Sequence, residues 1–241
     1  MSSLFGSRFG RQSVIVVLVL FGAVWLASLA FWPDPTRTCP QGGAPIKIMP
    51  LGDSHTDGHN VPGGYRIDLW KRLVADDLCV DFVGSEFNGP RTLPDRHHEG
   101  HSGWRIDQIT DSVAEWLNRW RPDIVLLMIG GRDLARNDTL DSAPGRLGAL
   151  LDRILQSGPE TRVVVASIPP LADPDLLRRA RTFNEALPAI VASKGARVSY
   201  VDAFAALDQA DLDTDGIHLT VGGYEKLAAV WHAAIRSLVT R

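Results

Sequence analysis

Cysteine is scarce in this sequence, with two among 241 residues. Cys39 and Cys79 do not form a CxxC pair, so the sequence predicts neither a redox motif nor a cysteine-based metal site. In an exported protein the two residues could be joined in a disulfide, and elsewhere they would be free thiols. The sequence alone leaves both states open.

The chain also lacks an excess of charge of either sign. Its formal net charge is −3 at pH 7, and no long block of Lys and Arg interrupts it. A basic surface for nucleic acid is therefore not expected, and nucleic acid is not a predicted partner. Internal repeats are missing as well, and 241 residues with 45% hydrophobic content predict one globular domain plus a short extra piece.

That extra piece lies at the start of the chain, where residues 13–32 carry no charge and are rich in Val, Leu, Ile, Phe and Ala. The stretch is about as long as a helix that spans a bilayer. Arg8 and Arg11 precede it, which favours a cytoplasmic N-terminus and an exported domain. A cleaved signal peptide is the alternative, because residues 28–30 offer small side chains at cleavage-type positions.

We therefore expect three parts: a signal-anchor or signal peptide at 1–32, a linker rich in Pro and Gly at 33–45, and a domain at 46–241. The expected location is a membrane anchor with the domain exported to the periplasm or the outside of the cell. If the N-terminal segment is cleaved, the domain is secreted.

Strand-like and helix-like segments alternate through the domain. Short apolar runs typical of buried strands lie at 46–51, 80–84, 123–129, 162–168 and 197–201. Helical spacing of apolar residues occurs at 67–78, 106–120, 144–156, 174–193 and 221–240. The stretch 88–103, rich in Gly, Pro and His, is interpreted as a loop. The alternation predicts a three-layer α/β/α fold with a parallel five-stranded sheet, whose post-strand loops gather along one edge.

Ser54 follows the first predicted strand, directly after Gly52 and Asp53. A serine between a buried strand and a helix N-terminus has an exposed hydroxyl beside partial positive charge. That setting suits a nucleophile whose reaction passes through an oxyanion. The same turn also occurs simply as a helix cap, so Ser54 alone is a candidate that needs a base.

The last predicted loop supplies such a base. Asp215 and His218 are three positions apart, immediately before the final helix. One turn of chain can bring the carboxylate to one ring nitrogen, so that Asp215 orients His218 while His218 takes the proton from Ser54. The simpler interpretation is a histidine at a helix entry, with Thr220 as the cap.

Four short motifs, each in a predicted loop, appear in a fixed order. They are a Gly-Asp-Ser turn at 52–54, His-Glu-Gly-His-Ser-Gly-Trp at 98–104, Gly-Gly-Arg-Asp at 130–133, and Asp-Gly-Ile-His at 215–218. Together they resemble the SGNH hydrolase superfamily, also called GDSL-type esterases and lipases, from about residue 46 to 241. The stretches 63–66, 81–85 and 98–100 look most like those of carbohydrate esterases that remove acetyl groups from polysaccharides.

The resemblance implies a flavodoxin-like domain that uses no metal and no cofactor. By it, Ser54 is the nucleophile, His218 the base and Asp215 the residue that orients the base. The oxyanion hole would consist of the backbone N–H groups of Ser54 and Gly103 and a side chain of the third motif. The substrate would be an acetylated carbohydrate or another small acyl ester, and a lipid or thioester acyl chain is the alternative for the same triad.

Two positions depart from the family's usual pattern. His55 stands where a branched apolar residue commonly follows the serine, and Arg132 stands where the family has the asparagine that completes the oxyanion hole. A guanidinium carries several N–H donors and a full positive charge, so Arg132 can replace the amide. Arginine is longer than asparagine, so its guanidinium could extend past the oxyanion hole. The protein would then be a slow enzyme with two backbone donors, or a glycan-binding domain without turnover.

Three further residues are candidate substrate contacts: His101, Trp104 and Asp53. Trp104 could stack on a sugar ring or simply pack against the domain. His101 also belongs, with His97, His98 and Glu99, to a group that could be imagined as a zinc cluster. These four crowd one loop and lack a second ligand group at a metal-binding spacing, so no metal site is predicted.

Overall fold

The computed structural model describes residues 39, 43–135 and 141–239. The predicted membrane segment at 13–32 and most of the predicted linker lie outside them, so those predictions stay predictions. Within the described residues, no helix combines the length and the apolar character needed to cross a membrane. All of these residues fall in the unit Cys39–Arg241.

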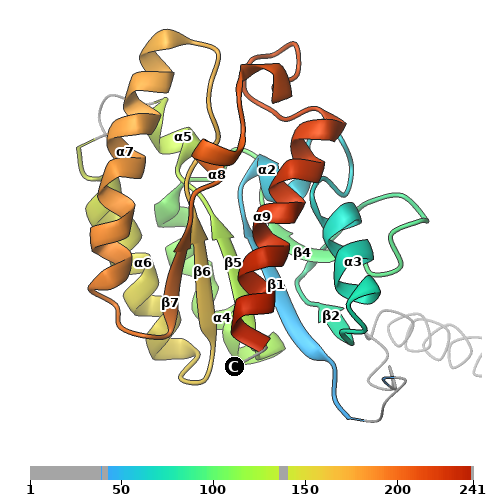
Figure 1. Ribbon diagram of the computed structural model, residues 1–241. Coiled ribbons are helices and arrows are strands. Elements are labelled where there is room, and N and C mark those ends of the chain that lie inside the picture. The colour runs from blue at the N-terminus through green and yellow to red at the C-terminus, as the bar shows by residue number, and fades with distance from the viewer. Residues whose placement is uncertain (1–38, 40–42, 136–140, 240–241) are drawn as a thin grey trace, which may run out of the picture. The chain divides into compact units, whose positions relative to one another are not determined.

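The described strands form one mixed sheet, whose parallel part contains all five predicted strands (Figure 1). β1 is flanked by β2 and β5, and β6 and β7 continue the sheet beyond β5. The bounds of these strands are β1 (Ile46–Gly52), β2 (Val80–Phe82), β5 (Ile124–Met128), β6 (Arg162–Ala166) and β7 (Val198–Val201). The prediction of a central parallel sheet is confirmed.

The predicted loop at 88–103 is partly wrong, because it contains a strand. β4 (His97–Gly100) pairs in parallel with the C-terminal end of β1 and antiparallel with β3 (Glu86–Phe87). The sheet is therefore seven-stranded and mixed rather than five-stranded and parallel. Polar residues occupy β4 without the apolar alternation that marks a strand, and their side chains bond locally: Ser85 donates its N–H to Glu99, at 2.6 Å.

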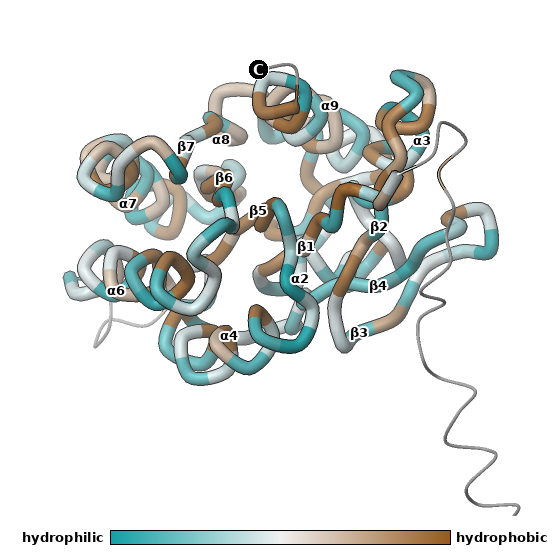
Figure 2. Tube along the Cα trace, turned by 90° about the horizontal axis from the view of Figure 1, so that it is seen from below, coloured by the Kyte–Doolittle hydropathy of each residue, from teal (hydrophilic) through white to brown (hydrophobic). Residues whose placement is uncertain are grey.

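Helices cover both faces of the sheet, as predicted (Figures 1 and 2). α4 (Ile106–Trp120), α6 (Ala143–Ser157) and α7 (Pro174–Ala192) pack on one face, and their apolar residues form one core cluster. α3 (Arg66–Ala75) and α9 (Val221–Val239) pack on the other face and form the second cluster. Each of these helices lies within three residues of its predicted bounds.

β5 shows why the central strands lack polar residues. Val125 and Leu127 point into one core cluster, while Leu126 and Met128 point into the other. All four side chains are buried. A strand covered by helices on both sides gains from apolar residues at every position, which produces the unbroken run seen in the sequence.

Short helices lie where the chain leaves the parallel strands. α2 (Ser54–Asp57) follows β1, α5 (Gly131–Leu134) follows β5, and α8 (Ala203–Ala206) follows β7, with a 3-10 turn at Gln209–Asp211. α2 begins tightly against the sheet: a side chain at Gly52 would place its Cβ 2.0 Å from the carbonyl oxygen of Met128. Only glycine permits this approach, which brings the residue after β1 to the same edge as the residue after β5.

Cys39 and Cys79 are joined in a disulfide across 40 positions of the chain. Of the two states left open by the sequence, the structure has the bonded one. The bond ties Cys39, within the predicted linker, to the residue just before β2, at the end of the sheet opposite Ser54.

Candidate active site

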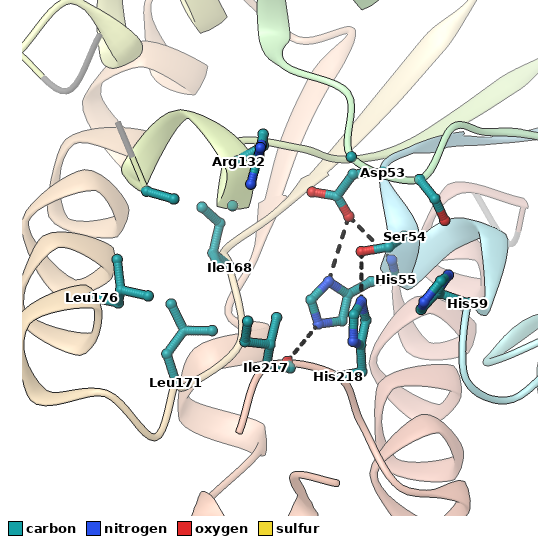
Figure 3. A pocket seen from close by; sticks show the side chains of 14 residues that line it. Asp53, Ser54, His55, His59, Arg132, Ile168, Leu171, Leu176, Ile217 and His218 are labelled. Carbon is teal, nitrogen blue, oxygen red and sulfur yellow. Dashed lines mark hydrogen bonds and ion pairs between the residues drawn. The ribbon is translucent and has the colours of Figure 1, made fainter. Parts of the chain in front are cut away.

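Ser54, His218 and Asp215 form a continuous chain of contacts, although 161 positions separate the serine from the aspartate. His218 Nε2 lies 2.9 Å from Ser54 Oγ, and His218 Nδ1 lies 2.6 Å from Asp215 Oδ2 (Figure 3). With Nδ1 protonated toward the carboxylate, Nε2 is free to accept the serine proton. The arrangement can therefore activate a serine hydroxyl.

Asp215 is held in place by its own loop. Its Oδ1 accepts the backbone N–H groups of Ile217 and His218, each at 2.9 Å. Partial burial by itself would raise the pKa of Asp215, but the hydrogen bonds from the His218 ring and from these two N–H groups lower it to about 2. The carboxylate therefore stays ionised at neutral pH and can accept the Nδ1–H of His218.

Ser54, the candidate nucleophile, lies in the first turn of α2, directly after its N-cap Asp53. Asp53 Oδ1 accepts the backbone N–H of His55 at 3.1 Å, which fixes the turn that presents Ser54. Asp53 is also one of the residues that line the cavity in front of Ser54. Asp53 therefore caps α2, and its predicted contact with a substrate stays a prediction.

Two more imidazoles flank the ring of His218. His55 is buried and its ring centroid lies 5.6 Å from that of His218, while exposed His59 lies 5.1 Å away on α2's C-terminal side. His55 Nε2 contacts the carbonyl oxygen of Ile217 at 3.1 Å. His55 thus connects the turn of Ser54 to the loop of His218.

Gly103 lies at the rim of the same cavity, in the turn that joins β4 to α4. The turn is closed by the N–H of Trp104, which donates to the carbonyl of His101 at 3.1 Å. Gly103 has φ +78°, and a Cβ there would meet nothing within 4 Å. The positive φ angle, rather than a lack of space, thus favours glycine at this position. Among the described residues, no acceptor forms a hydrogen bond with the backbone N–H of Gly103 or of Ser54.

Arg132 enters the cavity from α5 and is exposed, whereas its neighbour Asp133 is fully buried. Asp133 accepts the backbone N–H of Ile106 at 3.1 Å and the guanidinium of Arg146 at 2.5 Å. These bonds tie α5 to the start of α4 and to α6, and so hold Arg132 beside the turn of Gly103. Figure 3 shows Arg132 between Asp53 and Ile168.

The cavity has a volume of about 390 Å³ and two chemically different walls. Ser54, His55, His59 and His218 form the polar side. Aliphatic side chains form the other side: Ala135, Ile168, Leu171, Leu176 and Ile217 (Figure 3). The triad therefore faces a space that can hold both a polar alcohol and an apolar group.

His101 and Trp104 lie outside this cavity lining. The His101 ring stacks on Trp104, at 4.2 Å between centroids, and on Trp116, at 4.8 Å, while the two tryptophan rings lie 6.1 Å from each other. His101 Nε2 also contacts buried Glu99 Oε2 at 3.0 Å. Both rings pack against their neighbours beside the Gly103 turn, and their predicted contacts with a substrate stay predictions.

The histidines of β4 face separate partners. His97 Nδ1 lies 3.0 Å from Asp95, and His98 Nδ1 accepts the N–H of Gly100 at 2.9 Å. In the part of the chain that the structure describes, no three His, Cys, Asp or Glu residues are grouped so that they could hold a metal ion. The imagined zinc cluster is therefore not assembled by this fold.

Sequence reasoning missed the aliphatic wall and the contact of His55 with Ile217. Ile168 and Leu171 flank Pro169 and Pro170, where the chain leaves β6 at the edge of the sheet that holds Ser54. That break was the available signal, because residues after parallel strands converge at one edge. Leu176 lies in α7 and has no comparable sequence signal.

Comparisons with known proteins agree with this geometry. The model of the GDSL-like Lipase/Acylhydrolase family matches residues 51–226. A multidomain esterase of Ruminococcus flavefaciens is 30% identical over 237 residues, which cover 87% of this chain and 31% of that protein. The chain thus spans about a third of the length of this relative.

Two solved structures match this chain over nearly their whole length. A family 3 carbohydrate esterase of Clostridium thermocellum has 39% identity and a TM-score of 0.72, over 80% of this chain and 98% of its own. A family 3 carbohydrate esterase of Talaromyces cellulolyticus has 29% identity and a TM-score of 0.72, over 81% and 98%. The family predicted from the four motifs is confirmed.

Proposed function

This chain belongs to the GDSL-like lipase/acylhydrolase family, and we propose that it is a serine esterase that hydrolyses O-acetyl or other short-chain acyl esters on a carbohydrate. The chain of contacts from Asp215 through His218 to Ser54 carries the proposal. The similarity to two carbohydrate esterases supports a sugar as the alcohol part of the ester. Neither a metal nor a cofactor takes part in the proposed reaction.

In the proposed first half-reaction, Ser54 Oγ attacks the ester carbonyl while His218 Nε2 takes its proton. The imidazolium is stabilised by Asp215, whose carboxylate remains ionised. Collapse of the tetrahedral intermediate breaks the bond to the sugar oxygen, and His218 returns the proton to that oxygen. The sugar leaves with its hydroxyl restored, and the acyl group remains on Ser54.

In the second half-reaction, water attacks the acyl-enzyme and gives its proton to His218. The resulting intermediate collapses to free acid and Ser54, which recovers its proton. Both intermediates carry an oxyanion. We propose that the backbone N–H groups of Ser54 and Gly103 bind it, with the guanidinium of Arg132 as the third donor.

The position of Arg132 supports its place in this hole. It is exposed within the cavity on α5, whose orientation is fixed by the bond of Asp133 to the start of α4. Exchange of Arg132 for Asn, the residue usual in the family, tests the role. A loss of kcat by about 10²- to 10³-fold would mark arginine as a working donor, and a gain would mean that it handicaps the hole.

The direct test is release of acetate from acetylated xylan and other acetylated glycans by the purified protein. We expect turnover by the natural chain, none by Ser54→Ala, and natural activity in Ser193→Ala, whose hydroxyl bonds the end of α7. Equal rates in the natural protein and Ser54→Ala would overturn the catalytic assignment. Saturable glycan binding with no turnover in either protein would instead favour a glycan-binding domain.

The aliphatic wall favours a second candidate with the same triad, a hydrolase of longer acyl esters. Ile168 and Leu171 are buried beside the cavity, and an acetyl methyl group fills only a small part of 390 Å³. A series of 4-nitrophenyl esters from acetate to octanoate separates the two. A maximum of kcat/KM at acetate supports the carbohydrate acetylesterase. A maximum at six or more carbons supports the alternative, because each added CH₂ group that is buried against the wall contributes about 0.8 kcal/mol of transfer free energy.

We also propose that the domain works outside the cytoplasm, on a membrane anchor or as a secreted protein. The apolar segment at 13–32 and its preceding arginines support an anchor or a signal peptide. The disulfide between Cys39 and Cys79 supports an oxidising compartment. Protease treatment of intact cells or spheroplasts tests this: the domain should be degraded, whereas protection until lysis would contradict export.

A further inference from the structure

Arg132 differs from the other arginines near the cavity in having no partner among the residues that the structure describes. Arg146 bonds Asp133, Arg179 bonds Asp175 and the carbonyl of Leu134, and Arg66 donates to backbone carbonyls such as that of Thr56. No described residue forms a hydrogen bond or ion pair with the guanidinium of Arg132. Its positive charge therefore lies at the cavity and is not paired with any described residue.

The cavity supplies little to neutralise that charge. Asp53 is the one acid among its lining residues; its side chain is 8% exposed, and its Oδ1 is taken by the His55 N–H and lies 3.4 Å from His55 Nδ1. Asp57 and Asp215, which lie nearby, bond Ser102 and His218. The titratable groups that remain on the lining are the imidazoles of His55, His59 and His218.

The surroundings of Arg132 also strengthen any interaction with an anion. Figure 3 shows it above the aliphatic wall formed by Ile168, Leu171 and Leu176. Aliphatic side chains offer no competing acceptors and lower the local dielectric when a ligand displaces water. A guanidinium in such a place binds a carboxylate through two parallel N–H···O bonds, a geometry that an asparagine amide cannot provide.

From these observations we propose that Arg132 recognises a carboxylate on the substrate, so that the preferred substrates are esters of acidic rather than neutral sugars. The inference rests on the proposed esterase function and narrows its substrate class. The carboxylate lies either on the sugar, as in an acetylated uronic acid, or at the end of the acyl group, as in a succinyl ester. Five N–H donors on one guanidinium allow a contact with the carboxylate beside one with the oxyanion.

Matched pairs of esters test the proposal. The first pair is the 3-O-acetyl methyl glycosides of galacturonic acid and galactose, which differ in one carboxylate. The second pair is the succinyl and butyryl esters of methyl galactoside, and it moves the carboxylate to the acyl side. The measured quantity is the ratio of kcat/KM within each pair, because a donor to the oxyanion alone changes both members equally.

We expect the natural protein to prefer the acidic member of one pair by about 10- to 100-fold, which identifies the source of the carboxylate. In Arg132→Asn that ratio should fall to about one, while Arg132→Lys should keep part of it. Arg153→Asn removes an exposed arginine of α6 and should leave the ratio unchanged. A ratio of one in the natural protein, or an equal ratio in Arg132→Asn, would overturn the proposal.

Failure of the proposed esterase activity gives a different result, namely no turnover of any of the four esters. In that case calorimetric titration of Ser54→Ala with the same two pairs of esters still decides the question. Tighter binding of the acidic member of one pair that disappears when Arg132→Asn is added supports the recognition of a carboxylate. Equal binding within both pairs overturns it.

Discussion

His55 Nε2 lies 3.1 Å from the carbonyl oxygen of Ile217, the residue between Gly216 and the candidate base His218. On its other side, His55 Nδ1 lies 3.4 Å from Asp53 Oδ1, at the N-cap of the helix that begins with Ser54. One buried ring thus spans the nucleophile turn and the loop of the base. The 2.9 Å contact between Ser54 and His218 depends on the relative position of these two loops.

Loss of this bridge should slow the reaction more than it weakens substrate binding. We expect His55→Ala to lower kcat by about 10- to 100-fold, because small displacements of reacting groups cost that much. KM should change less, since His55 is only 4% exposed. Steady-state kinetics with an activated acetyl ester measures both constants.

His55→Gln is the matched control, because a glutamine amide can reach the carbonyl of Ile217 as Nε2 does. It should recover a large part of the activity that His55→Ala loses. Natural kcat in His55→Ala would show that Ser54 and His218 keep their positions without the ring.

Asp215→Asn should lower kcat by up to about 10⁴-fold with little change in the fold. The amide can donate to His218 Nδ1, which then loses its proton, so that Nε2–H faces Ser54 and cannot accept the serine proton. The comparison is kcat for the natural chain and Asp215→Asn, with circular dichroism as the check on folding. Asp213, two positions away, bonds Asn60, and an effect of equal size in Asp213→Asn would contradict a specific role for Asp215.

Buried apolar periodicity made most of the fold predictable. β5 is apolar at every position because helices cover both of its faces, and α4 carries an apolar stripe toward the sheet. β4 escaped prediction because its residues are polar and their side chains bond to neighbouring loops, as Glu99 does with Ser85. Local hydrogen bonding of this kind leaves no periodic signal in the sequence.

The part of the candidate site that lies in short sequence motifs was predictable. Ser54, Asp215 and His218 stand in short motifs, and the structure brings all three into contact. The partners of His101 were not predictable, because its stacking on Trp104 and Trp116 depends on how α4 packs against the preceding turn. Such contacts arise from tertiary packing, and spacing along the chain does not encode them.

The disulfide should contribute substantially to stability. It closes a loop of 40 residues that contains β1, α2 and α3, and the loss of loop entropy in the unfolded chain predicts about 4 kcal/mol. We expect the double variant Cys39→Ser, Cys79→Ser to unfold at lower urea concentration than the natural protein. Its kcat should stay close to natural, because the bond lies at the end of the sheet opposite Ser54.

A reductant provides the control for that measurement. Dithiothreitol should shift the unfolding midpoint of the natural protein to that of the double variant and leave the variant unchanged. Equal midpoints for the oxidised and reduced protein, with reduction verified by thiol titration, would contradict the stabilising role.

His98 should make the protein less stable in acid. Its side chain is fully buried in β4, and burial, together with the charge of nearby Arg66, lowers its pKa to about 2. In the unfolded chain its pKa returns to about 6.5, so below that pH the unfolded state binds one more proton than the folded state. The contribution of His98 to the free energy of unfolding is therefore constant above about pH 6.5. Below that pH the free energy of unfolding falls by about 1.4 kcal/mol per pH unit, until the pH approaches the pKa of His98 in the folded state.

His98→Asn isolates this effect from the carboxylates that also titrate in acid. The Asn carbonyl oxygen can take the place of Nδ1, which accepts the N–H of Gly100 at 2.9 Å, and the amide does not titrate. Urea unfolding at several values between pH 7 and pH 4 gives the free energy of unfolding for both proteins. We expect the natural protein to lose stability relative to His98→Asn as the pH falls below about 6.5, with the slope given above. Parallel curves would mean that His98 binds a proton equally well in the folded and unfolded states.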